Sequence, residues 1–190
     1  MVSSNESTDE LIVEGLRSYF EACVAMDEFY KRIYEGCRVV LAKHNRSLCE
    51  ALELKNRILS IDDYSEDDAT TIDAGHVWIG AGAPLAEHFN SDFHVALWWD
   101  YKSSPAGVVK AAVGIEAHER FRDIRDVYEA EAPDRIRAVA DWSSILLCEE
   151  VPRDNAQAWR ASLDRLVMEW ATLWRRLGGL SGIRTRLKKN

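Results

Sequence analysis

Residues 92–101, DFHVALWWDY, alternate apolar and polar side chains as a half-buried β-strand does, with Phe93, Val95 and Leu97 on one face. The same period of two recurs in HVWIGAG at 76–82 and GVVKAAVGIEA at 107–117. SSPAG at 103–107 has the composition of a hairpin turn. These segments predict a three-strand antiparallel meander, and the apolar run SSILLCEEV at 143–151 predicts one further strand.

A long apolar seam precedes the strands. Ser7 and Glu10 have the spacing of a capping box and predict a helix start. Gly36 and HNRS at 44–47 leave open whether this helix is single or broken into two. The seam packs on its own domain or forms a homodimer through the N-terminal helix. Its members recur at alternating steps of four and three: Ile12, Leu16, Tyr19, Cys23, Met26, Tyr30, Ile33, Cys37 and Val40.

The last predicted helix is rich in Trp. Asp154 or Asn155 can cap it, and Gly178 and Gly179 are natural terminators. Its apolar stripe, which predicts core packing, consists of Trp159, Leu163, Leu166, Trp170, Leu173 and Leu177. A charged surface helix is expected at 118–132. The fold class is therefore α+β: a small antiparallel sheet backed by the long N-terminal helix or helix pair and by the Trp-rich C-terminal helix.

The length of 190 residues predicts a single domain. It divides into an N-terminal helical segment (1–58), an acidic loop (59–75), the sheet and helices (76–180) and a basic tail (181–190). The chain shows no signal-peptide pattern and no apolar run long enough for a membrane span, so we expect a cytoplasmic protein. The four Cys form no CxxC pair, and Cys23 and Cys37 are expected to be buried reduced thiols.

Acidic residues gather in the middle of the chain, whose net charge is −8. No Lys or Arg lies between Arg57 and Lys102. An acidic field repels phosphate backbones and attracts basic proteins, which argues against direct nucleic-acid binding here. The sequence thus favours a non-catalytic module that binds a basic protein surface, for example a phage-type anti-defence inhibitor that mimics DNA on a nucleic-acid-binding complex. The candidate partner-binding residues are Asp62, Asp63, Glu66, Asp67, Asp68, Asp73, Glu87 and Asp92.

Specific metal and cofactor motifs are missing from the sequence. An EF-hand loop starting at Asp63 would need Gly at its sixth position and Glu at its twelfth, but Asp68 and Ala74 stand there. There is no P-loop, no G-x-G-x-x-G, no G-x-S-x-G and no H-E-x-x-H. No cofactor and no metal are predicted.

The second face of the predicted sheet supplies an enzymatic alternative. Ala96, Ala112 and Gly114 would form a trench walled by Trp78 and Trp98. His94 would lie opposite Glu116, as a general base, as a metal site with His118, or as a hydrogen-bonded pair.

The predicted order of helices and strands, with Asp100 and Glu116 on the second and third strands, is similar to that of PD-(D/E)XK nucleases. The resemblance implies a metal-dependent hydrolase using Asp100, Glu116, His94 and His118. However, Ala117 and His118 follow Glu116 where that family has x-Lys. A third interpretation is an oligomeric structural or interaction protein built on the helical seam.

Overall fold

The computed structural model of the protein describes residues 3–54, 70–73, 76–84, 92–100, 105, 107–117, 143–179, 181–182 and 185. The chain divides into two compact units, Met1–Arg32 (unit 1) and Ile33–Asn190 (unit 2). The division falls inside the segment 1–58 that was predicted to be helical.

Helix α1 (Ser3–Ala51) is a single unbroken helix that passes through the unit boundary. It continues through Gly36 and through residues 44–47, so neither site breaks it. It also begins at Ser3, and the predicted start at the Ser7 capping box is therefore wrong. A capping box is a local preference of about 1 kcal/mol, which does not prevent the preceding residues from joining the helix.

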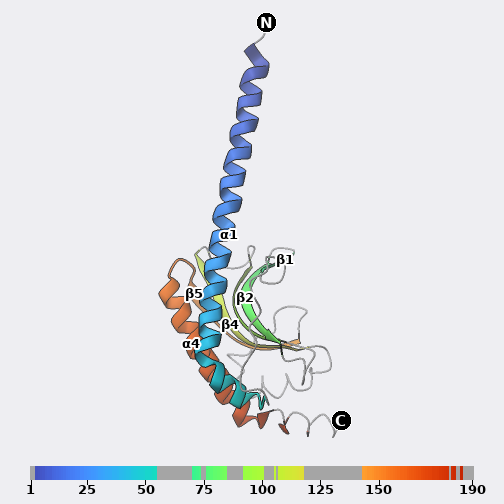
Figure 1. The fold of residues 1–190 in the computed structure, drawn as a ribbon, viewed down its shortest axis with the longest axis vertical. Helices are drawn as coiled ribbons and strands as arrows, with labels where there is room; N and C mark the ends of the chain where they lie inside the picture. The colour runs from blue at the N-terminus through green and yellow to red at the C-terminus, as the bar shows by residue number, and fades with distance from the viewer. Residues whose placement is uncertain are drawn as a thin grey trace. The chain divides into compact units, whose positions relative to one another are not determined.

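Unit 2 contains one antiparallel sheet of five strands, whose spatial order follows the chain (Figure 1). The α+β fold class is confirmed. The first strand lies in the segment that was predicted as an acidic loop, and that prediction is corrected here: TTID carries β-branched residues, which favour a strand. The strands are β1 (Thr70–Asp73), β2 (His76–Pro84), β3 (Asp92–Asp100), β4 (Val108–Ala117) and β5 (Ser143–Pro152).

One face of the sheet and the C-terminal helix α4 (Ala156–Arg176) form the core, as predicted. The Phe93 ring lies 4.8 Å from that of Trp170 in an edge-to-face contact. Asn155 is the cap that forms: its side chain accepts a hydrogen bond from the Ala158 backbone N–H. Gly178 and Gly179, both with left-handed backbone angles, follow the end of α4. The six residues of its predicted apolar stripe are all buried.

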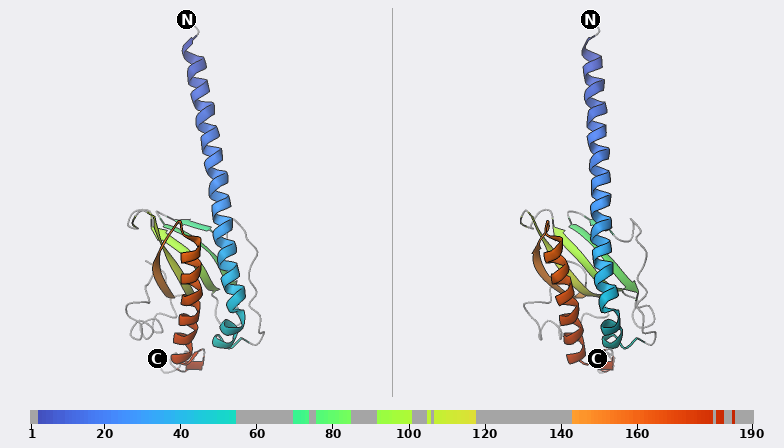
Figure 2. Two further views of the ribbon diagram at one scale, coloured as in Figure 1. Left: turned by 90° about the vertical axis from the view of Figure 1, so that its left-hand side faces the viewer. Right: turned by 60° about the vertical axis from the view of Figure 1, so that its left-hand side comes forward.

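The part of α1 that belongs to unit 2 packs beside α4 on the same face of the sheet (Figure 2). A Cβ atom added at Gly36 would lie only 2.3 Å from Cη2 of Trp159, so glycine permits this close approach of the two helices. The next residue, Cys37, is fully buried and hydrogen-bonds the backbone of Ala81 in β2. The prediction of buried thiols is correct for Cys37 and wrong for Cys23, which is exposed.

Candidate interaction surface

Unit 1 exposes large apolar side chains along its helix. Burying such side chains is the main source of stability in proteins, and contiguous apolar surface of this kind marks a site that another surface covers. Eight of them lie within 16 residues and are 46–72% exposed: Leu11, Ile12, Val13, Leu16, Tyr19, Phe20, Val24 and Met26. The sequence predicts the seam but not its exposure.

Five of the residues in unit 1 recur at the alternating steps of four and three of a heptad repeat, and we call them the exposed seam: Ile12, Leu16, Tyr19, Cys23 and Met26. Glutamates recur every seventh residue at positions 14, 21 and 28, and all three are exposed. In heptad notation the seam occupies positions a and d, and the glutamates occupy position f on the opposite side of the helix. The helix is therefore amphipathic with the period of a coiled coil.

Polar contacts also occur on the exposed seam. A hydrogen bond to Cys23 raises the pKa of Tyr19 above its ordinary value. The neighbouring ring of Phe20 meets that of Tyr19 edge to face, with centroids 5.8 Å apart. The seam and the flanking Phe20 thus combine an aromatic pair and a thiol, and Tyr and Phe are enriched at the centres of protein interfaces.

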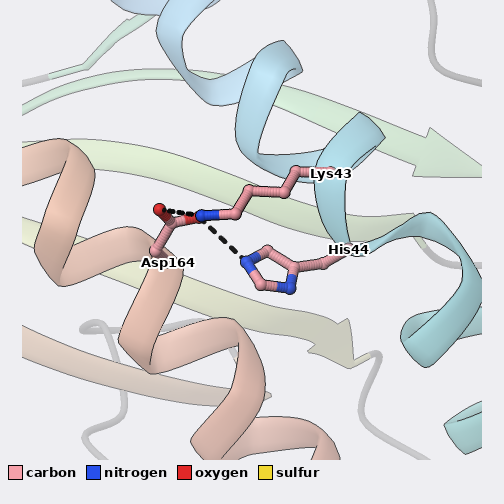
Figure 3. Close-up of polar contacts among 3 residues, drawn as sticks. All are labelled: Lys43, His44 and Asp164. Atoms are coloured by element: carbon pink, nitrogen blue, oxygen red, sulfur yellow. Dashed lines mark hydrogen bonds and ion pairs between the residues drawn. The ribbon is translucent and has the colours of Figure 1, made fainter.

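Unit 2 holds a polar cluster between its part of α1 and α4 (Figure 3). Lys43 Nζ donates to Asp164 Oδ2 at 2.6 Å, and His44 Nε2 lies 2.8 Å from Asp164 Oδ1. Burial by itself would raise the pKa of Asp164, but the hydrogen bonds from Lys43 and His44 outweigh it and lower that pKa. The cluster ties the two helices together. Sequence reasoning missed it because 120 residues separate His44 from Asp164.

The second face of the sheet has the predicted composition but a different register. His94 lies opposite Gly114, two residues from the predicted partner Glu116, which instead pairs with Ser144 of β5. The prediction that His94 faces Glu116 is therefore corrected: the strand pairing sets the register, and alternation alone determines only the face.

The floor of the predicted trench is closed to solvent. Ala96 and Ala112, which are paired in the register, are both 0% exposed. His94 packs edge to face against Trp78, with centroids 5.9 Å apart. On the same face, Lys110 Nζ lies 4.4 Å from the ring centroid of Trp98, a cation–π contact. Among the described residues, these contacts pack the floor and walls of the predicted trench against one another.

The two acids of the nuclease-like interpretation lie at opposite ends of the β3–β4 ladder. Asp100 follows the pair Trp98–Lys110, whereas Glu116 follows the pair Phe93–Ile115. The five residue steps from Lys110 to Ile115 alone span roughly 16 Å of strand. That separation is too long for two ligands of one metal ion, so this register does not support the shared metal site. His118 lies outside the described residues.

Only some of the acidic residues predicted to bind a partner are among the residues that the structure describes. Asp62, Asp63, Glu66, Asp67, Asp68 and Glu87 lie outside the described residues. Asp92 begins β3, at the end of the sheet where it pairs with Pro84. Asp73 and Asp100 both lie opposite His76, one from β1 and one from β3. The sheet thus brings two carboxylate-bearing positions, Asp73 and Asp100, into one row across three strands.

Neither a metal centre nor a membrane span is found in the part of the chain that the structure describes. Within it, His, Cys, Asp and Glu residues form no group of three that could hold a metal ion. Its helices also lack any segment with the length and apolar character that crossing a bilayer requires. Burial raises the pKa of the Cys37 thiol to about 12, which makes this cysteine unsuitable as a nucleophile at neutral pH.

No protein-family model, curated protein or solved structure matches the chain.

Proposed function

We propose that this is a non-catalytic, cytoplasmic interaction protein that binds another polypeptide through the exposed seam of unit 1. The observation that carries the proposal is the apolar surface of this helix, where eight large apolar side chains are exposed and four of them, Ile12, Leu16, Tyr19 and Met26, lie on the seam. Fully burying a Leu, Ile, Phe or Met side chain contributes about 1.5–3 kcal/mol, so leaving such a set in water is costly. A helix with apolar residues at heptad spacing is recognised by laying that face against another helix or into a groove.

A photo-crosslinking residue at position 19 tests this function in cells. Tyr19 is on the exposed seam, and Glu21 on the opposite side of the same helix is the matched control position. We expect a covalent adduct from position 19 and none from position 21, because only the seam faces the partner. Equal adducts from both positions, or none from either, would refute the proposal, and the mass of the adduct reports the partner.

A second proposal concerns the acidic residues between Arg57 and Lys102. It is favoured by the register, which brings Asp73 and Asp100 into one row across β1, β2 and β3. The partner would be a basic protein surface, such as the nucleic-acid site of a complex that the protein inhibits.

Replacing Asp62, Asp63, Asp67 and Asp68 together by Asn tests the acidic proposal without changing side-chain size. We expect binding of a basic target to be lost, and binding by the unaltered protein to weaken as salt rises, since salt screens exposed charges. Unchanged binding by the variant would count against this proposal and would leave the seam proposal untouched.

A further inference from the structure

We infer that the occupant of the exposed seam is a second copy of this chain, packed parallel and in register as a two-stranded coiled coil. This inference rests on the proposed function of the seam and names its partner. It is drawn from the heptad pattern of unit 1, from the shapes of the residues beside the seam, and from their charges.

The heptad pattern points to a partner helix with the same repeat. A straight α-helix drifts by about 20° per heptad relative to a 3.5-residue repeat, so a partner helix with the same repeat can follow the seam when the two helices supercoil together. In unit 1 the seam keeps strict steps of four and three from Ile12 to Met26. A second copy supplies the matching repeat, and its glutamates at position f point away from the contact.

The residues beside the seam fit each other in shape. In a parallel pair, position g of one helix faces position e of the next heptad in the partner. Gly15 occupies g and Phe20 occupies e, so the glycine of each copy faces the Phe20 ring of the other. A Cβ atom added at Gly15 would meet nothing within 4 Å, which leaves space for that ring.

Unit 2 shows the same kind of fit within one chain. Gly36 occupies the g position three heptads after Gly15, and the ring of Trp159 from α4 fills the space beside it. A glycine at this position of α1 therefore accepts an aromatic ring from a neighbouring helix. An antiparallel pair would place g against g and e against e, so Phe20 could not fill the space at Gly15.

The charges do not oppose self-association. The next pair of flanking positions sets Ala22 against Asp27, and Asp27 already pairs with Lys31 of its own helix at 2.7 Å. No like charges face each other across positions e and g between Val13 and Asp27. Between Val13 and Asp27, a second copy thus brings no like-charged pair to the flanks of the seam.

Sedimentation equilibrium of the purified full chain tests the inference. We expect the unaltered protein to have the mass of two chains at micromolar concentration. Leu16→Glu places two carboxylates in the apolar contact and should raise the dissociation constant at least tenfold. Val24→Glu makes the same apolar-to-acid change at a 60% exposed position outside the seam, and it should leave the dimer intact.

The substitution Gly15→Leu distinguishes specific packing of Phe20 beside Gly15 from non-specific hydrophobic association. The added side chain occupies the space assigned to Phe20, so the dimer should weaken although the surface becomes more apolar. Stronger association of this variant would overturn the parallel packing. Far-UV circular dichroism of each variant confirms that unit 2 is folded, since Gly15, Leu16 and Val24 all belong to unit 1.

Oxidation of the native Cys23 tests the register. In a parallel, in-register pair the two Cys23 thiols face each other at position a. Diamide removes two electrons and two protons from the pair, is itself reduced to the hydrazine, and leaves one disulfide. We expect a disulfide-linked dimer through Cys23, absent from Cys23→Ser, and a missing disulfide would overturn the register.

The outcomes distinguish this inference from the proposed function. If the protein is monomeric and position 19 crosslinks to a different polypeptide, the inference that a second copy occupies the seam is overturned, and the proposed function is supported. A monomer without any adduct would overturn both. A dimer that Val24→Glu breaks as readily as Leu16→Glu would show that the seam is not the contact.

Discussion

The substitution Gly36→Ala tests the helix contact on which unit 2 is built. The new methyl would lie 2.3 Å from Cη2 and 2.8 Å from Cζ3 of Trp159, whereas carbon atoms normally pack at about 3.5–4.0 Å. Trp159 is only 3% exposed, so its ring can move only by displacing the side chains packed around it. Overpacking of a core costs about 1–3 kcal/mol, and a contact this short belongs at the upper end.

The intrinsic preference of helices for alanine offsets part of this cost. Alanine is about 1 kcal/mol more favourable than glycine inside a helix. The net destabilisation is therefore about 2 kcal/mol, which corresponds to a fall in Tm of about 4–8 °C for a unit of this size.

Urea and thermal unfolding followed by circular dichroism measure this effect. The matched control is Gly15→Ala, the same change on the same helix, where nothing lies within 4 Å of the added methyl. It should leave the unfolding of unit 2 unchanged. If Gly36→Ala were as stable as the unaltered protein, the close packing of α1 on Trp159 would be refuted, and with it the precedent for an aromatic ring beside Gly15.

Three further predictions concern single side chains. Asn155→Ala removes the cap that accepts from Ala158 N at 2.9 Å and should cost about 1 kcal/mol in urea unfolding, whereas Asn155→Asp should retain most of it. The pKa of Asp164 is lower in the folded protein than its ordinary value of 3.8, so the ionised carboxylate stabilises the fold at pH values above 3.8. This stabilisation is lost as the pH falls through the pKa of the folded state. Asp164→Asn should therefore be less stable than the unaltered protein at pH 6, with the difference in Tm closing below about pH 4; a constant difference would contradict the assigned hydrogen bonds. With its pKa near 12, Cys37 should resist iodoacetamide at pH 8 until the protein unfolds, as mass spectrometry of the labelled peptides would show.

Periodicity in the sequence determined the type and faces of most of the fold. Steps of four and three predicted the long helix, alternation predicted β2, β3 and β4, and the Trp stripe predicted the buried side of α4. These patterns succeed because helices and strands repeat every 3.6 and 2 residues, so the sequence alone shows which face of each element is apolar.

Only the tertiary structure decided what lies against each apolar face. The seam of α1 has one period throughout, yet Leu16 is exposed in unit 1 whereas Ile33 is buried in unit 2. The partner of His94 across the strands and the meeting of His44 with Asp164 likewise depend on residues distant in sequence. Local periodicity carries no information about such distant contacts, because they are set by how the elements pack and not by the pattern within each one.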